Sequence, residues 1–102
     1  MANSAAFTVI ISSRAQKEIA QAWNWYEDRQ QGLGDRFIKE ITTRFRKIET
    51  NPFRFPKRYK AYYEAIVPVF PYLIIYKVLK RKNSIHIVSI FHTSLDPKRK
   101  FK

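Results

Sequence analysis

The sequence predicts a single α+β domain in the order β-α-α-β-β-β, with a helical hairpin packed on one face of a small antiparallel sheet. Two observations support this fold class. Apolar residues recur at spacings of three and four between residues 15 and 48, which is the period of a helix. From residue 61 the period changes to two, which is the period of a half-buried strand. A chain of 102 residues has room for one domain, so we expect both layers to share one core.

The chain is expected to begin with a short strand and a long helix. Residues 7–11 (FTVII) are β-branched and aromatic, and they predict a strand at an edge of the sheet. Ser13 and Gln16 form a capping-box pattern, which predicts that a helix opens here and runs to about residue 30. Glu18 is expected to point away from the buried stripe of this helix. The stripe consists of Ala15, Ile19, Ala22, Trp23 and Tyr26.

A second helix follows after a break of about four residues. Residues 32–34 (GLG) interrupt the first helix, Asp35 is suited to cap the second, and residues 51–52 (NP) end it. Two helices joined by so short a connection are expected to pack antiparallel. The predicted buried stripe consists of Phe37, Ile38, Ile41, Phe45 and Ile48. We expect Trp23, Ile41 and either Tyr72 or Ile74 to lie in one core.

The second half of the chain predicts three antiparallel strands. They cover residues 61–67, 70–79 and 85–91, with a hairpin turn at 80–84 and a polar, basic tail from about residue 93. A helical hairpin has one apolar face to bury, and so does this meander. We therefore expect the helices to cover one face of the sheet and to leave the other face free for function.

Composition excludes several classes of protein. The chain has no cysteine, which excludes disulfides and thiolate zinc sites and fits a reducing cytoplasm. No apolar run approaches the roughly 18 residues of a membrane helix, and the first residues lack the pattern of a secretory signal. The expected location is therefore cytoplasmic. No nucleotide-binding or common hydrolase motif is present, so we expect no cofactor.

The charge is strongly asymmetric. Residues 1–50 hold 8 basic and 6 acidic groups, whereas residues 51–102 hold 12 basic and 2 acidic groups, a net charge of +10. Charge this uneven costs self-repulsion and favours a polyanionic partner, either a nucleic acid or an acidic protein. The alternative interpretation is a soluble basic domain that has no specific partner. The basic residues are scattered over strands and loops, which argues against a membrane-binding helix.

The residues suited to chemistry gather near the end of the chain. His86 and His92 are the only histidines, and carboxylates are scarce after residue 50, so we expect no metal site. RNA cleavage needs an acid or base and cations around the phosphate. His92 can serve as the acid or base and Arg81 as a phosphate clamp. We expect them to meet on the sheet face away from the helices, where the last strand, the 80–84 turn and the tail come together.

Basic and aromatic residues alternate around the first strand of the meander and continue into the tail. This interleaving suits stacking on single-stranded RNA, and a packed loop is equally compatible with it. The expected nucleic-acid or partner-binding residues are Arg58, Lys60, Lys77, Lys98, Arg99 and Lys100.

An ordered set of short blocks resembles the RelE/ParE superfamily of type II toxin–antitoxin toxins, sometimes called plasmid stabilization proteins. The blocks are S-x-x-A-x-x-E-I at 12–19, AWNWYE at 22–27, GLGDRF at 32–37, NP at 51–52, FPYLIIY at 70–76 and I-x-H-x-x-x-D-P at 90–97. Together they cover nearly the whole chain, which makes residues 1–102 one toxin domain. The resemblance implies the fold given above and a small acidic antitoxin as partner. It also implies one of two targets, which are mRNA on the ribosome (RelE-like) and DNA gyrase (ParE-like).

Two arginines of the superfamily pattern are replaced in this sequence. Tyr63 stands where relatives commonly have an arginine shortly before the FPY strand, and Leu95 stands where they have one after the histidine. Lys100 stands at a position that is commonly aromatic. These replacements leave open whether the protein is an mRNA endoribonuclease with His92, Arg81 and Tyr63 in its site. The GLG and FPY blocks are similar to the ParE-like branch, whose members need no ribonuclease site.

Three functions are therefore compatible with the sequence. The first is a toxin that arrests growth until its antitoxin neutralises it. The second is a non-enzymatic, basic nucleic-acid-binding domain, and the third is a degenerate toxin that only binds its antitoxin. A neighbouring gene for a small acidic protein favours the first or the third.

Overall fold

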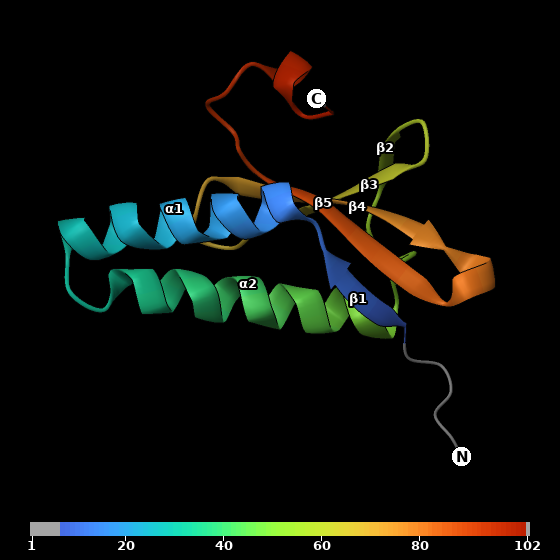
Figure 1. Cartoon of the computed structure of the whole chain (residues 1–102), viewed down its shortest axis with the longest axis horizontal. Helices are drawn as coiled ribbons and strands as arrows, with labels where there is room; N and C mark the ends of the chain where they lie inside the picture. The colour runs from blue at the N-terminus through green and yellow to red at the C-terminus, as the bar shows by residue number, and fades with distance from the viewer. Residues whose placement is uncertain (1–6, 102) are drawn as a thin grey trace.

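The computed structural model describes residues 7–101, and these form a layer of two helices and a layer of five strands (Figure 1). The expectation of no secretory signal depends in part on residues 1–6, which lie outside the described residues, as does Lys102. The elements in chain order are β1 (Thr8–Ile11), α1 (Ser13–Arg29), α2 (Leu33–Thr50), β2 (Lys57–Tyr59), β3 (Tyr62–Ile66), β4 (Tyr72–Leu79), η1 (Lys80–Lys82), β5 (Ser84–His92) and η2 (Pro97–Arg99). The predicted α+β fold class and the antiparallel helical hairpin are confirmed.

The sheet has the strand order β1-β5-β4-β3-β2 and is mixed. β3, β4 and β5 form the predicted antiparallel meander, whereas β1 pairs in parallel with β5, from Thr8 opposite Ser84 to Ile11 opposite Ile87. β2 was not predicted, because a strand of three exposed residues carries no alternation of apolar and polar positions.

α1 is fixed to the sheet by the residue that precedes it. Its N-cap is Ser12, whose Oγ accepts a hydrogen bond from the backbone N–H of Ala15 at 3.0 Å and donates to the carbonyl of Val88 at 2.9 Å. The cap therefore lies one residue before the predicted Ser13. Because Ser12 bonds both to α1 and to β5, it aligns the helix with the strand that it covers.

The corner between the helices is built by side chains from α1. Gly32 has φ +89°, which favours glycine, and it stands as the N-cap of α2 without a capping side chain. The carboxylate of Glu27 instead accepts hydrogen bonds from the N–H groups of Gly32 and Gly34, at 2.8 and 2.9 Å. Asp35, predicted as the cap, lies in the first turn and accepts from the Trp23 indole at 3.0 Å. A negative charge near a helix N-terminus is favourable, and here Glu27 supplies it across the corner.

One apolar core joins the helices to the nearer face of the sheet. Ile41 and Ile74 are both buried in it, and Tyr72 packs against it, as predicted. Trp23 lies outside this cluster at the helical corner, contrary to expectation, because its indole bonds to Asp35. The buried members are Ala15, Ala22, Tyr26, Phe37, Ile41, Ile48, Ala65, Val67, Phe70, Ile74, Tyr76, Ile85, Ile87 and Ile90.

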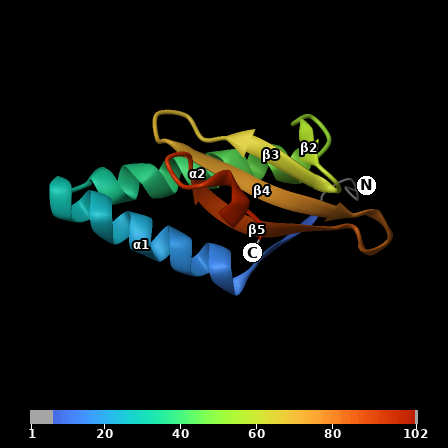
Figure 2. The same ribbon diagram turned by 90° about the horizontal axis from the view of Figure 1, so that it is seen from above.

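The opposite sheet face is partly covered by the C-terminal segment, residues 93–101. Figure 2 shows this segment lying over the strands when the molecule is seen from above. Phe101 contacts Tyr59 and Tyr62, and the Lys100 ammonium lies 3.0 Å from the Glu64 carboxylate. The expectation that this whole face is free is therefore wrong, because the tail supplies apolar and charged contacts to it.

Candidate functional site

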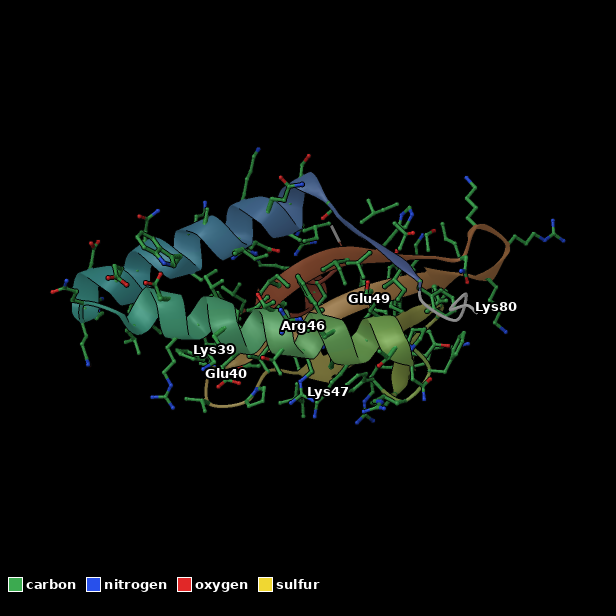
Figure 3. The ribbon with its side chains drawn as sticks, turned by 90° about the horizontal axis from the view of Figure 1, so that it is seen from below. Lys39, Glu40, Arg46, Lys47, Glu49 and Lys80 are labelled. Atoms are coloured by element: carbon green, nitrogen blue, oxygen red, sulfur yellow. The ribbon has the colours of Figure 1, made fainter. Side chains whose placement is uncertain are left out.

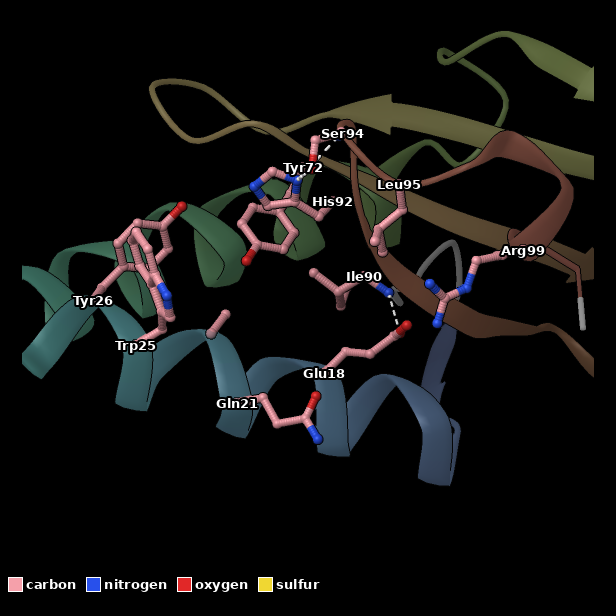
Figure 4. Close-up of a pocket in the computed structure, with 11 residues that line it drawn as sticks. Glu18, Gln21, Trp25, Tyr26, Tyr72, Ile90, His92, Ser94, Leu95 and Arg99 are labelled. Carbon is pink, nitrogen blue, oxygen red and sulfur yellow. Dashed lines mark hydrogen bonds between the residues drawn. The ribbon is translucent and has the colours of Figure 1, made fainter.

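A groove of about 440 Å³ opens between α1 and the end of β5 (Figure 4). We call it the His92 groove. Apolar and polar side chains both line it, and they come from α1, from the strands and from the C-terminal segment. Its lining includes Glu18, Gln21, Trp25, Tyr26, Tyr72, Ile90, His92, Ser94, Leu95 and Arg99.

His92 is held in the groove by its own turn. Its Nδ1 accepts a hydrogen bond from the backbone N–H of Ser94 at 3.1 Å and lies 2.7 Å from the Ser94 hydroxyl. Because a backbone N–H can only donate, the neutral ring carries its proton on Nε2. The ring packs edge-on against Tyr72, its cross-strand partner, with centroids 4.9 Å apart. Since Tyr72 faces the helices, His92 also lies on the helix side of the sheet, contrary to the prediction.

Glu18 connects α1 to an irregularity in β5. Ser89 pairs with Ile75 and Ile87 pairs with Tyr76, so β5 has one extra residue at this point. Glu18 Oε1 accepts from the Ser89 hydroxyl and from the Ile90 N–H, both at 2.9 Å. Glu18 was expected to point away from the buried stripe of α1, whereas its carboxylate reaches β5. This contact joins a carboxylate to a serine 71 residues away in the sequence. No local sequence pattern predicts such a pair.

Two tyrosines on β4, the half-buried Tyr72 and the buried Tyr76, have pKa values raised above the ordinary range. Burial raises the pKa of Tyr72 to about 12, helped by Tyr26 and then by the Glu18 charge. Burial also raises the pKa of Tyr76, and the neighbouring Tyr63 adds to this effect. The Tyr76 hydroxyl donates to the carbonyl of Pro52. Both phenols therefore serve the fold as neutral groups.

We expect the free energy of unfolding to fall as pH rises from about 10 to about 12. A phenol whose pKa is raised by folding binds more protons in the folded state, so alkali favours the unfolded chain. Each tyrosine adds at most about 1.4 kcal/mol per pH unit to the slope. Urea denaturation at several pH values measures it. Tyr72→Phe should have a shallower slope than the natural chain, and an equal slope would contradict the assignment.

The sheet separates the predicted catalytic residues. Arg81 lies in η1 beside the Leu79–Ser84 pair, whereas His92 pairs with Tyr72 at the other end of β4. Seven residues of strand separate these ends, which is about 23 Å. The expectation that the 80–84 turn meets the end of the last strand is wrong, because an antiparallel hairpin places them at opposite ends.

Tyr63 also lies away from His92. It pairs with Tyr76 and stacks on it, with ring centroids 5.2 Å apart and an interplanar angle of 12°. The Lys57 ammonium lies 5.5 Å from the centroid of the Tyr63 ring. Along β4 the partners of Tyr63 and His92 are four residues apart, about 13 Å. His92, Arg81 and Tyr63 therefore occupy three separate places.

Most of the predicted nucleic-acid or partner-binding residues lie close together, unlike the predicted catalytic residues. Arg58, Lys98 and Lys100 line one hollow on the tail-covered face, with Tyr59 and Phe101. Lys60 lies beside the ring of Tyr59, which lines the hollow, and Lys77 lies beside the ring of Tyr62, which contacts Phe101 of the hollow. Arg99 is separate, because its side chain lines the His92 groove. Their common signal in the sequence is the alternation of basic and aromatic residues.

Arg14 fixes the C-terminal segment that completes this hollow. Its guanidinium donates to the carbonyls of Arg99 and Lys100, at 2.6 and 2.8 Å.

Among residues 7–101, no group of three or more histidine, aspartate or glutamate side chains lies together as a metal site would require. Within the same residues, no helix is long and apolar enough to cross a membrane.

The architecture defines the class of protein. Two antiparallel helices on one face of a five-stranded mixed sheet, followed by a basic C-terminal segment, form the fold of the RelE/ParE superfamily toxins. A family model described as the ParE toxin of the type II toxin–antitoxin system parDE matches residues 9–97. The chain therefore belongs to the ParE toxin family.

A solved structure supports the fold independently. A chain described as "Chromosomal ParDE TA system from P. aeruginosa" superposes with a TM-score of 0.75 and 11% sequence identity. The alignment covers 87% of the present chain and 98% of that chain. At this identity the likeness concerns the fold alone. No curated protein shows significant sequence similarity to the chain.

Proposed function

We propose that this protein is the toxin of a type II toxin–antitoxin module, and that it arrests growth by acting on DNA gyrase until a small acidic antitoxin neutralises it. The family match over residues 9–97 carries the toxin role. The separation of Arg81, Tyr63 and His92 over about 23 Å supports the gyrase target, since RNA cleavage needs these groups around one phosphate. Action on gyrase implies a cytoplasmic protein.

The antitoxin is expected to be acidic because the second half of the toxin carries a net charge of +10. Charge complementarity speeds association and selects partners. We therefore propose an amphipathic, acidic segment as the contacting element. Binding should weaken as salt rises, because exposed charges are screened.

Cleavage of mRNA remains the second candidate, because His92 and Arg99 line the same groove. As an imidazolium, which would give up the Ser94 N–H bond to Nδ1, His92 can protonate a leaving oxygen from Nε2, and the Arg99 guanidinium can hold a phosphate in the same groove. This mechanism would use Arg99 in place of the predicted Arg81. It makes His92 indispensable, whereas action on gyrase does not involve it.

Inducible expression in a bacterium tests the proposal. We expect growth arrest with DNA damage and intact mRNA, relieved by co-expression of the neighbouring acidic antitoxin. We also expect His92→Ala to retain the arrest, and the purified toxin to inhibit gyrase supercoiling in vitro. Ribosome-dependent mRNA cleavage that falls by about 10²-fold or more in His92→Ala would establish the second candidate instead. Absence of arrest, with antitoxin binding intact, would indicate a degenerate toxin.

A further inference from the structure

Three aromatic rings form a continuous row on the tail-covered face of the sheet. Phe101 stacks on Tyr59, with centroids 4.6 Å apart and an interplanar angle of 24°, and it contacts Tyr62 at the same distance. An ammonium group lies beside each tyrosine of the row. The Lys60 Nζ is 5.2 Å from the Tyr59 ring centroid, and the Lys77 Nζ is 5.6 Å from the Tyr62 ring centroid. We call Tyr59, Tyr62 and Phe101 the aromatic platform. Because Tyr59 is 46% exposed, the platform presents ring surface to a ligand.

A hollow of about 640 Å³ lies beside the platform and is strongly basic. Arg58, Lys98 and Lys100 line it, and Glu64 is its one carboxylate among the described residues. Lys100 pairs with Glu64 at 3.0 Å, and this pair is the only ion pair in the hollow within residues 7–101. The positive charges of Arg58 and Lys98 are therefore left for a ligand. Asp96 is the only other acidic residue among residues 51–102, and it accepts from the Lys98 N–H at 3.0 Å.

We propose that the aromatic platform and this hollow bind single-stranded nucleic acid. A base stacks on the exposed part of the Tyr59 ring, on the side that the Lys60 ammonium borders and Phe101 does not cover, while the adjoining phosphates lie along Arg58, Lys60 and Lys98. Ring faces flanked by cations are the combination that binds single strands without reading their sequence. The inference goes beyond the proposed function, because it depends neither on gyrase nor on the antitoxin.

The observations favour a single strand over a duplex or an acidic protein. A duplex hides the faces of its bases and offers only phosphates, so it cannot use Tyr59. An acidic protein would pair with Arg58 and Lys98 and gain little from a stacked row of rings. The same chemistry admits RNA and DNA, because both expose π faces and phosphates.

Fluorescence anisotropy with the purified full chain tests the proposal. The probes are labelled oligo-U and oligo-dT of about twelve nucleotides, a duplex of equal length and polyglutamate as competitor. We expect both single strands to bind more tightly than the duplex and than polyglutamate. Tyr59→Ala should weaken binding about tenfold or more, whereas Tyr59→Phe should keep it. A stronger affinity for oligo-U identifies RNA as the ligand, a stronger affinity for oligo-dT identifies single-stranded DNA, and equal affinities show that the site binds both.

The charged residues are tested through salt dependence. Arg58→Ala with Lys98→Ala should lower the log–log salt slope by about 1.4, which corresponds to two fewer phosphate contacts on a single strand. The matched control is Lys39→Ala with Lys47→Ala, which removes the same charge from α2, where neither lysine lines the hollow (Figure 3). This control should leave the slope nearly unchanged.

Two outcomes would overturn the proposal. In one, Tyr59→Ala binds as tightly as the natural chain although circular dichroism shows it folded. In the other, the control pair on α2 weakens binding as much as the pair in the hollow, which would indicate diffuse electrostatic attraction. Neither outcome bears on growth arrest or gyrase inhibition, so failure of this inference is distinguishable from failure of the proposed function.

Discussion

Truncation of Ile41 to alanine is expected to lower the free energy of unfolding by about 2–5 kcal/mol. Ile41 is 2% exposed, and it lies on the face of α2 that packs into the core shared with the sheet. The substitution removes buried methyl groups and leaves a cavity that rigid neighbours fill only in part. A domain of this size has about 5–15 kcal/mol of stability in total, so the loss is a large fraction of it.

Urea denaturation followed by tryptophan fluorescence measures this loss. Ile66→Ala is the matched control, because it makes the same chemical change at a side chain that is 70% exposed. The control should change stability by less than about 0.5 kcal/mol. If Ile41→Ala is equally mild, α2 does not pack on the sheet as described.

The fold was predictable because its main elements have strong local periodicity. The 15–26 stripe of α1 and the 37–48 stripe of α2 follow the helical period, and β4 is an almost continuous apolar and aromatic run whose centre is buried on both faces. The parallel pairing of β1 with β5 was not predictable from these patterns. It joins residues 76 positions apart, such as Thr8 and Ser84, and periodicity contains no information on strand direction.

The two helices show why local sequence patterns predict the helix correctly but not the residue that caps it. Ser12 and Ser13 are chemically equal as caps, and contact with the Val88 carbonyl in β5 favours Ser12. Likewise Asp35 is a good capping residue, yet Glu27 of the preceding helix α1 bonds to the N–H groups at the N-terminus of α2. In both cases a tertiary contact decides between local alternatives.

The candidate site residues also fall into a group that the sequence predicted correctly and a group that it did not. The basic and aromatic residues of 57–63 and 97–101 meet because β2, β3 and the tail lie on one side of the molecule (Figure 2). Arg81 and His92 do not meet, because their proximity depended on the register of one hairpin. The position of the C-terminal segment could not be predicted from local sequence patterns either, because it depends on a hydrogen bond between Arg14 and Lys100, which are 86 residues apart.

Replacement of Glu18 by alanine is expected to cost about 2–4 kcal/mol of unfolding free energy, as loss of hydrogen bonds to a charged group in a partly buried place. One oxygen of Glu18 accepts from both the Ser89 hydroxyl and the Ile90 N–H. Ser89 is fully buried and Ile90 is 1% exposed, so neither donor can turn to solvent. The other oxygen bonds to Arg14 at 3.2 Å, and Arg14 in turn holds the C-terminal segment.

A series of variants isolates this contribution. Glu18→Gln keeps an acceptor oxygen and should lose about 1 kcal/mol or less, and Ser89→Ala removes one donor without leaving it unsatisfied. The double variant Glu18→Ala with Ser89→Ala should be less destabilised than the sum of the single losses, because the orphaned hydroxyl is gone. Strict additivity, or equal losses for Glu18→Ala and Glu18→Gln, would show that the carboxylate does not hold β5 through these bonds. Urea denaturation of the four variants at neutral pH distinguishes these results.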